Sequence, residues 1–226
     1  MPSGGTTCTC SESSCSNCNT YSGGAADDLN YGIWESGTGG SITYFANAHA
    51  FSASWGGSSE DFLAHVGLDS GGTSSYTAFG TITAQFAESK SGSAGGYSSI
   101  GMYGWLQNPC VEWYIVDDSF QTMPTQVSGV TATIDGGEYY LMKLTTTGTA
   151  GANACNGTVS SWTQMWSVRT TARQCGTITV SDHFAAWANQ GWSVGDVSSI
   201  HINVEVGGGT GSIDFPTASV TTSAKP

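Results

Sequence analysis

The sequence is short of charge, and above all of positive charge. Only 10% of its 226 residues are charged, with 5 basic residues against 17 acidic ones, whereas an average globular protein has roughly 25%. A net charge of −12 repels phosphate backbones and anionic membrane surfaces, so we expect neither nucleic acid nor a membrane as a partner. The sequence also lacks a run of about 18 apolar residues, which argues against a membrane-spanning helix.

Residues that favour helices are scarce as well. Leucine occurs only six times, whereas Gly, Ser and Thr, which disfavour helix interiors, are abundant. The composition does not indicate disorder, because 8 Trp, 9 Tyr and 8 Phe provide large side chains for a core. A chain of this length suits one undivided all-β domain. The composition therefore predicts a single all-β domain that handles something neutral.

The cysteines are unevenly distributed over the chain. Four lie in the first 20 residues and three lie far apart: Cys8, Cys10, Cys15, Cys18, Cys110, Cys155 and Cys175. Two close pairs can bind zinc, but the loop between them is short for a zinc ribbon, so we favour a disulfide-bonded extension of a secreted protein. The odd number leaves at least one thiol free or bonded to another chain. Because Met1 is not followed by the basic and apolar regions of a signal peptide, we interpret the chain as a mature secreted protein.

From Tyr21 onward, short alternating segments separated by glycine-rich turns predict the strands of a sandwich or barrel. We expect strands at 42–45, 51–55, 76–87, 99–105, 111–116, 130–134, 139–146, 162–171, 176–180, 200–206 and 212–215. Residues 181–190 instead predict a helix, because Phe184, Trp187 and Ala188 recur at helical spacing. Ser181 is the expected N-cap and Gly191 the expected C-terminal glycine.

Two predicted strands each place one glutamate opposite their apolar face. Along 111–116 the alternation puts Glu112 on the face away from the core, and along 200–206 it does the same for Glu205. Each glutamate on its own is more simply explained as a residue facing solvent. If both strands belong to one curved sheet, however, the two carboxyl groups can face each other across a groove. Such a pair is what the cleavage of a glycosidic bond requires.

Five segments resemble a known family, and they occur in the family's order. The longest are 103–116 (YGWLQNPCVEWYIV) and 176–191 (GTITVSDHFAAWANQG), and the others are 31–35, 51–55 and 164–169. They resemble the family 11 glycoside hydrolases, which are small endo-β-1,4-xylanases, over about Tyr21 to Phe215. The resemblance implies an all-β fold, a β-jelly-roll sandwich of two twisted antiparallel sheets with a single α-helix at about 181–190. It divides the chain into a Cys-rich extension (1–20), a catalytic domain (21–222) and a tail (223–226).

The resemblance also implies roles for individual residues. Glu112 falls on the family's nucleophile and Glu205 on its acid/base, which together cleave internal β-1,4-xylosidic bonds by double displacement with retention. Four further residues fall on substrate-binding positions: Tyr103 and Tyr114 orient the nucleophile and line the −1 sugar site, Trp34 stacks on a sugar in the −2 site, and Gln164 reaches the nucleophile from the base of the thumb loop. No metal and no organic cofactor is implied. His183, near the start of the helix, is interpreted as structural.

The resemblance further implies a secreted, extracellular monomer that acts on xylan or a related β-1,4-linked polysaccharide. Two alternatives stay open. One is a β-1,4-glucanase-like activity, since the related family 12 shares the fold and the mechanism. The other is a glycan-binding protein that has kept the groove but not the catalysis.

The sequence departs from the family pattern around the two glutamates. The residue expected to hydrogen-bond the acid/base aligns with Gly57, and the glycine-rich run 206–211 lacks the aromatic residue that follows the acid/base. Ser99 and Ser199 stand at positions of sugar-site tyrosines, and the thumb segment 147–158 lacks the Pro-Ser-Ile tip. We therefore expect the chemistry to be retained, and the substrate preference, sugar-site strength and pH optimum to differ.

Overall fold

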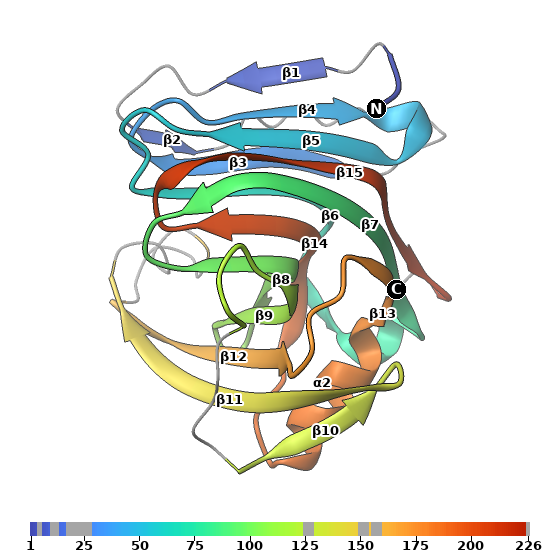
Figure 1. Ribbon diagram of the computed structural model, residues 1–226. Coiled ribbons are helices and arrows are strands. Elements are labelled where there is room, and N and C mark those ends of the chain that lie inside the picture. Colours follow the sequence, from blue (N-terminus) through green and yellow to red (C-terminus); the bar gives the residue numbers. More distant parts are fainter. Residues whose placement is uncertain are drawn as a thin grey trace.

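The computed structural model describes residues 1–3, 6–9, 14–16, 29–123, 129–148, 154 and 160–224. They form two β-sheets (Figure 1). The smaller sheet has the order β1 (Thr6–Thr9), β4 (Ser41–Phe45), β5 (Ala50–Trp55), β15 (Gly209–Thr222), β7 (Ile82–Ala94) and β13 (Cys175–Thr179). The larger has the order β10 (Thr131–Ile134), β11 (Gly137–Thr147), β12 (Ser161–Arg169), β9 (Val111–Asp118), β8 (Ser98–Gln107), β14 (Asp196–Val206), β6 (Asp61–Ser75), β3 (Asn30–Ser36) and β2 (Ser14–Ser16). The predicted all-β sandwich is thus confirmed.

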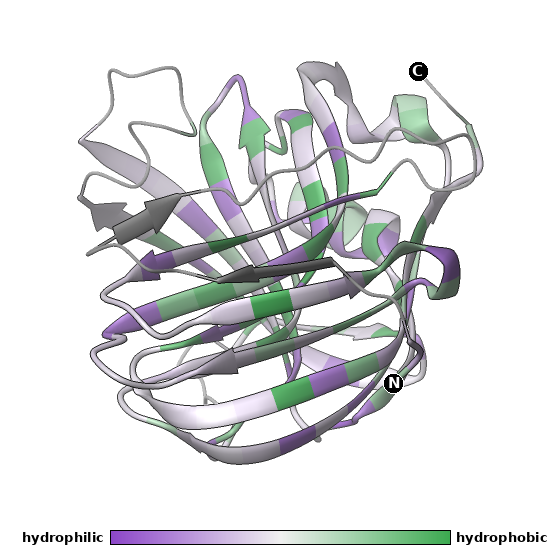
Figure 2. Ribbon diagram, turned by 90° about the horizontal axis from the view of Figure 1, so that it is seen from above, coloured by the Kyte–Doolittle hydropathy of each residue, from purple (hydrophilic) through white to green (hydrophobic). Residues whose placement is uncertain are grey.

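The core lies between the two sheets. It joins apolar side chains from the larger sheet, among them Ile33, Trp113 and Val204, to others from the smaller sheet, among them Phe51 and Phe215. Hydrophobic and hydrophilic residues alternate along many of the strands (Figure 2), as expected where only one face of a strand meets the core. The opposite face of the larger sheet is therefore free to line a cleft.

The helix predicted at 181–190 is confirmed as α2 (Val180–Asn189). Its buried residues Phe184 and Trp187 pack against Trp113 of β9, with ring centroids 5.0 and 6.4 Å away. Gly191 follows the helix with a φ of 74°, which only glycine adopts at low cost, and its N–H donates to the carbonyl of Ala188. The helix thereby supports from behind the strand that carries Glu112.

The expected N-cap was wrong. Thr179, not Ser181, occupies the N-cap position, and it makes no side-chain capping bond. The Asp135 carboxylate instead accepts hydrogen bonds from the Thr179 N–H and hydroxyl, both at 2.7 Å. Ser181 Oγ accepts a bond from the Ile82 N–H at 3.3 Å, so it fastens the helix to β7.

Three further expectations about the strands were wrong. Residues 61–75, which were not expected to form a strand, are the long strand β6, and Tyr76–Phe79 forms a 3-10 helix (η2) rather than the start of β7. A second 3-10 helix, η1, covers Ala46–Ala48. The larger sheet is not purely antiparallel, because β12 pairs with β9 in parallel and brings Gln164 opposite Glu112. This last pairing decides the geometry of the site.

The described part of the predicted N-terminal extension adds strands to the edges of both sheets, since β1 pairs with β4 and β2 with β3. The predictions for Cys10, Cys18 and Cys155, and for the side chains of Cys8 and Cys15, lie outside the described residues. Cys110 belongs to a disulfide, whereas Cys175 is a free and exposed thiol. Over the described ranges, no helix is long and apolar enough to cross a membrane.

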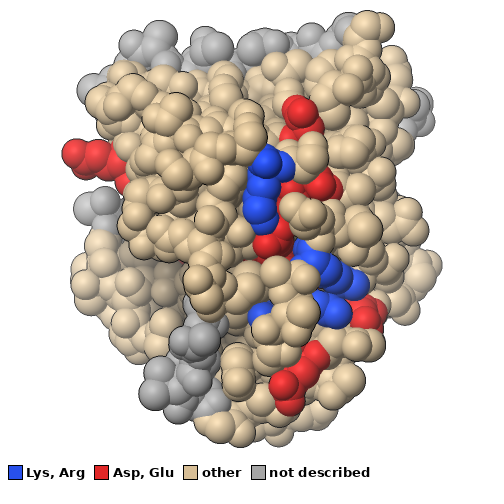
Figure 3. All heavy atoms as spheres, viewed as in Figure 1, with Lys and Arg blue, Asp and Glu red and all other residues tan. Residues whose placement is uncertain are grey.

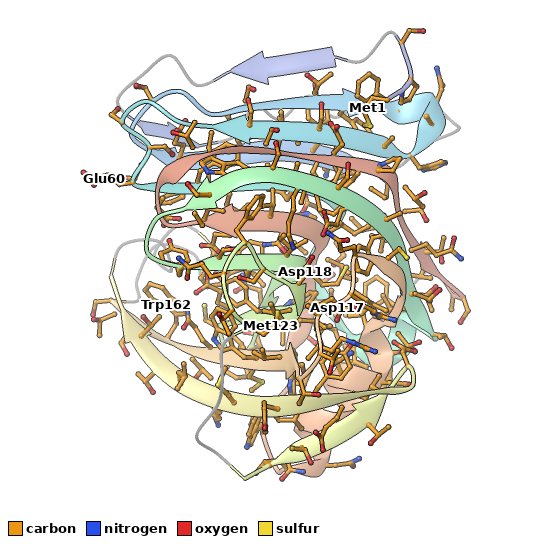
Figure 4. All side chains as sticks on the ribbon, viewed as in Figure 1. Met1, Glu60, Asp117, Asp118, Met123 and Trp162 are labelled. Atoms are coloured by element: carbon orange, nitrogen blue, oxygen red, sulfur yellow. The ribbon has the colours of Figure 1, made fainter. Side chains whose placement is uncertain are left out.

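A band of charged side chains crosses the face shown in Figure 3, where most of the surface is uncharged. Asp117 and Asp118, labelled in Figure 4, end β9 within this band. The fully buried Asp117 accepts hydrogen bonds from Arg173 Nε at 2.5 Å and Tyr139 Oη at 2.7 Å. Lys90 of β7 forms an ion pair with Asp118, and its Nζ lies 3.6 Å from Glu88 Oε1. These pairs link the smaller sheet to the strand that carries Glu112.

Candidate active site

The larger sheet lines one cleft with a volume of about 940 Å³. All six predicted site residues lie on its wall: Trp34, Tyr103, Glu112, Tyr114, Gln164 and Glu205. They come from five different strands and are brought together by the curvature of the sheet. The sequence therefore named residues that do meet in space, although no local pattern links them.

Glu112 is the most heavily hydrogen-bonded carboxyl group in the cleft. Its Oε1 accepts from Tyr114 Oη at 3.0 Å and from Tyr103 Oη at 3.3 Å. Its Oε2 accepts from Gln164 Nε2 at 2.7 Å and from Trp162 Nε1 at 2.8 Å. Because an indole and an amide nitrogen only donate, this arrangement suits an ionised carboxylate held in one orientation.

The strand geometry explains why Glu112 is buried. On β9 the neighbours Val111, Trp113 and Ile115 face the core, so Glu112 and Tyr114 face the cleft. The Tyr114 ring stacks on Trp166 of β12 at 3.8 Å, which covers the cleft face as well. Glu112 is only 6% exposed, so burial would be costly without its donors. The possibility that Glu112 is an ordinary solvent-facing glutamate is thereby excluded.

Glu205 lies on β14, in register with Leu63 of β6 and Ser99 of β8. Burial, followed by the negative charges of Asp61 and Glu112, holds the pKa of Glu205 well above its ordinary value, although the Tyr114 hydroxyl acts in the opposite direction. A glutamate in these surroundings keeps its proton at pH values where free glutamate has lost it. Its environment is thus the opposite of that of Glu112.

The residue next to Glu205 is Asp61, and the expectation for Gly57 was wrong. Gly57 lies in the turn between β5 and β6, with a φ of 65°, and faces the backbone of Thr38. The error came from missing β6, whose first residue is Asp61. Burial raises the pKa of Asp61, the hydrogen bond from Tyr97 acts in the opposite direction, and the charge of Glu112 raises it further.

We expected the cleft to lack an aromatic residue after Glu205. An aromatic residue from the connection between β7 and β8 takes its place. Gly207 leaves room for the Tyr97 ring, because a Cβ at Gly207 would lie 2.6 Å from two of its ring carbons. Tyr97 lines the cleft and is 46% exposed. The missing aromatic residue at position 207 is therefore replaced by one that comes from position 97.

The sequence did not point to Asp61, Tyr97 or Trp162, which also line the cleft. Trp162, labelled in Figure 4, follows Ser161 at the start of β12 and donates to Glu112. The sequence predicted that Trp162 begins a strand, but it did not predict that this strand pairs in parallel with β9. Trp105 adds a further link, since its indole N–H donates to Tyr103 Oη at 2.6 Å.

Ser99 and Ser199, which were expected at positions of sugar-site tyrosines, line the cleft. Ser199 Oγ accepts a hydrogen bond from the Trp105 N–H at 3.0 Å, and Ser99 is buried. His183 is fully buried, and burial lowers its pKa to about 3, which agrees with a structural role. Most of the thumb segment 147–158 lies outside the described residues, but the Ala154 carbonyl accepts a bond from Gln107 Nε2. Within the described ranges, no three His, Cys, Asp or Glu side chains are grouped as metal ligands.

Comparisons with known proteins identify the family. Residues 26–216 match the model of "Glycosyl hydrolases family 11". The chain is 40% identical over 200 residues to endo-1,4-beta-xylanase S20 of Neocallimastix patriciarum, and 38% identical over 199 residues to endo-1,4-beta-xylanase C of Fibrobacter succinogenes. These matches cover 84% and 87% of this chain but only 57% and 32% of the relatives, so the chain spans about half of the first and a third of the second.

Solved structures give the same result. The family 11 xylanase from Neocallimastix patriciarum superposes with a TM-score of 0.79 at 31% identity, covering 97% of this chain and 100% of that one. The wild-type ENZbleach xylanase superposes with a TM-score of 0.81 at 28% identity, covering 96% and 87%. The fold, the paired glutamates in one cleft and the match over 26–216 together show that the chain belongs to glycosyl hydrolase family 11.

Proposed function

We propose that the chain is an endo-β-1,4-xylanase that cleaves internal xylosidic bonds with retention, with Glu112 as nucleophile and Glu205 as acid/base. The observation that carries the proposal is the contrast between the two carboxyl groups: four donors hold Glu112 as an acceptor, whereas burial and neighbouring carboxylates raise the pKa of Glu205. A retaining glycosidase needs one charged and one protonated carboxyl group facing the same bond. The xylanase relatives support xylan as the substrate.

The reaction follows from these protonation states. In the first step, Glu112 attacks the anomeric carbon while Glu205 gives its proton to the glycosidic oxygen, which leaves with the aglycone. Glu205 is then a carboxylate and takes a proton from a water molecule. That water attacks the anomeric carbon from the side opposite to Glu112, breaks the glycosyl–enzyme bond and restores both groups. Two inversions give net retention.

Trp34, Tyr103, Tyr114 and Gln164 are the proposed substrate-binding residues. Tyr103, Tyr114 and Gln164 orient Glu112 through the hydrogen bonds given above, and Trp34, which is 37% exposed in the cleft, offers a flat apolar face to a sugar ring. The disulfide at Cys110 supports a secreted protein, since such bonds persist in oxidising compartments. The expectation of a monomer stays a prediction.

The test is the release of reducing ends from xylan, mixed-linkage β-glucan and cellulose under one set of conditions, with NMR detection of the anomer formed first. We expect xylan to be cleaved fastest and the β-anomer to appear before mutarotation. Faster cleavage of β-glucan would favour the glucanase alternative. Binding to xylan without any release of reducing ends, by a folded protein, would favour the glycan-binding alternative and overturn the proposal.

A further inference from the structure

Beyond the two glutamates, the cleft contains a second polar cluster, which we define as Asn30, His65, Asp69 and His201. Asp69 Oδ1 lies 2.9 Å from His201 Nε2, and Asp69 Oδ2 accepts from Asn30 Nδ2 at 2.6 Å. Because a carboxylate only accepts, His201 Nε2 carries the proton. The imidazoles of His65 and His201 stack at 4.3 Å with an angle of 10° between their planes. The cluster takes no part in the hydrogen bonds to Glu112.

The cluster lies far along the cleft from Asp61. Strand β6 carries both Asp61 and Asp69 on the wall of the cleft, eight positions apart, which corresponds to roughly 26 Å of extended chain. On β3 the residue Asn30 lies four positions before Trp34 and pairs with Gly67 of β6. The cluster therefore continues the groove past Trp34, on the side away from Asp61.

The surroundings leave Asp69 available to a ligand. Its register partner on β14 is Ser199, whose hydroxyl is already used by the Trp105 N–H, so no aromatic ring covers this part of the groove from β14. The Asp69 side chain is 41% exposed. Two of its roughly four acceptor positions are taken by His201 and Asn30, and the remaining ones can accept hydrogen bonds from outside.

The surroundings of Asp69 favour its charged form. Burial alone would raise the pKa of Asp69, but hydrogen bonds from His201 and Asn30 outweigh it and hold the pKa below its ordinary value. Burial, together with the proximity of His201, lowers the pKa of His65 well below its ordinary value, so His65 is neutral. A carboxylate on the wall of a cleft that also contains an exposed tryptophan suits a neutral sugar, which offers hydroxyl donors and a flat apolar face. It disfavours a sugar that carries an acidic substituent.

We propose that Asp69, positioned by Asn30 and His201, binds the hydroxyl groups of an undecorated sugar unit in a site beyond Trp34 and so sets how the polysaccharide is aligned for cleavage. This inference rests on the proposed function, because it assigns the sugar to the glycone side of the same cleft. His65 and His201 are positioning residues for Asp69. The site explains how the chain can bind a sugar although it has Ser199 where the family has a tyrosine.

The experiment compares Asp69→Ala and Asp69→Asn with wild type on linear xylo-oligosaccharides of increasing length, labelled at the reducing end. The matched control is Asp214→Ala, since Asp214 lies on a strand of the smaller sheet and outside the cleft. For the longest substrates we expect kcat/KM of Asp69→Ala to fall on the order of tenfold, as for the loss of a charge-assisted hydrogen bond, and Asp69→Asn to fall less. The shortest substrates should be cleaved as before, and cleavage of the long ones should move towards the non-reducing end.

An unchanged dependence on length together with an unchanged cleavage pattern in folded Asp69→Ala would overturn the proposal. A parallel measurement separates this result from a failure of the proposed function. The dissociation constants of the same oligosaccharides are measured by calorimetry for Glu112→Gln and for Glu112→Gln combined with Asp69→Ala. If wild type cleaves none of them, the proposed function fails, and the sugar site is still judged by whether Asp69→Ala weakens binding of the long substrates only.

Discussion

The β9–β12 side of the cleft and the β14–β6 side treat the same residue type in opposite ways. On the first side, two tyrosines, a glutamine and a tryptophan all donate hydrogen bonds to Glu112. On the second side, Glu205 is in the field of Asp61 and of Glu112 itself. Both glutamates sit in β-strands with alternating neighbours, so nothing in their immediate sequence distinguishes them.

The difference shows that residues on neighbouring strands set the protonation state of each glutamate. Donors stabilise the charged form of a carboxyl group, whereas burial and like charges stabilise the neutral form. The donors on Glu112 come mostly from β12 and β8, and the charge acting on Glu205 comes from β6 and β9. The division of labour between nucleophile and acid therefore belongs to the sheet order rather than to either strand.

The largest effect is expected from removing the charge on the donor-rich side. Glu112→Gln keeps the shape of the side chain but cannot form a covalent bond to the sugar, so xylan hydrolysis should fall by several orders of magnitude. Rates of reducing-end release measure the loss, and circular dichroism checks that the fold is intact. The matched control is Glu138→Gln, an exposed glutamate on β11, which should keep wild-type activity. A folded Glu112→Gln protein with a tenth of wild-type activity would remove Glu112 from the role of nucleophile.

The next effect tests whether the donors matter individually. Trp162→Phe keeps an aromatic ring but removes the N–H that donates to Glu112 Oε2, so kcat should fall about 10- to 100-fold, which corresponds to the loss of one hydrogen bond to a charged group. Steady-state kinetics on a xylo-oligosaccharide give the number.

Trp166→Phe is the control on the same strand. The indole N–H of Trp166 has no hydrogen-bond partner among the described residues, so its removal should cost far less. Equal losses in the two variants would mean that ring packing rather than the hydrogen bond to Glu112 is what Trp162 contributes.

The sequence predicted those elements of the site whose residues show a clear local pattern. Strand 111–116 and the helix at 181–190 have clean alternation or clean helical spacing, and both were predicted nearly as observed. Strand β6 was missed because Leu63 and Gly67 interrupt the polar face that carries Asp61, His65 and Asp69, so its alternation is incomplete. With β6 missing, Asp61 was overlooked and Gly57 was put in its place.

Two other features were invisible because they depend on pairing across the chain. The parallel register of β12 on β9 joins residues about fifty positions apart, and it decides that Trp162 as well as Gln164 reaches Glu112. The exchange of an aromatic side chain at 207 for Tyr97 depends on two separate segments packing together. Local propensity carries no information on either.

The third prediction concerns a change at Asp61 that leaves its neighbour Glu205 in place. The raised pKa of Asp61 means that it can work as a neutral carboxyl group beside Glu205, and an amide mimics that form at every pH. In wild type, activity falls as pH rises through the pKa of Asp61, because the charge of Asp61 raises the pKa of Glu205 and so makes Glu205 a weaker proton donor to the leaving group. Asp61→Asn removes this loss, so the basic limb of the pH profile of kcat/KM should move up by about one pH unit, equivalent to about 1.4 kcal/mol.

Glu60→Gln is the neighbouring control, because Glu60 is exposed and points into solvent (Figure 4). Its pH profile should match that of wild type. If the basic limb of Asp61→Asn instead moves to lower pH, then the charge of Asp61 acts mainly by keeping the proton on Glu205, and Asp61 works as a charged carboxylate rather than as a neutral carboxyl group.

The smallest effect on activity is expected for Glu88, a carboxyl group that is buried near another carboxyl group, as Glu205 is, but lies outside the cleft. Glu88 on β7 is 8% exposed, and burial followed by a hydrogen bond with Asp118 raises its pKa to about 8, although Lys90 acts in the opposite direction. The folded state thus favours the protonated form of Glu88. The protonated Glu88 therefore stabilises the folded protein fully below the pKa that Glu88 has in the unfolded chain, and this stabilisation is lost as pH rises through about 8.

The Glu88→Gln variant has no proton to lose at this position. Relative to this variant, wild type should lose as much as about 4 kcal/mol of unfolding free energy between about pH 5 and pH 9, measured by urea unfolding. Activity at neutral pH should stay unchanged, because Glu88 does not line the cleft. Parallel stability curves for the two proteins would mean that burial beside a second carboxyl group does not hold a proton in this fold, and the argument for the proton on Glu205 would then depend on Glu112 alone.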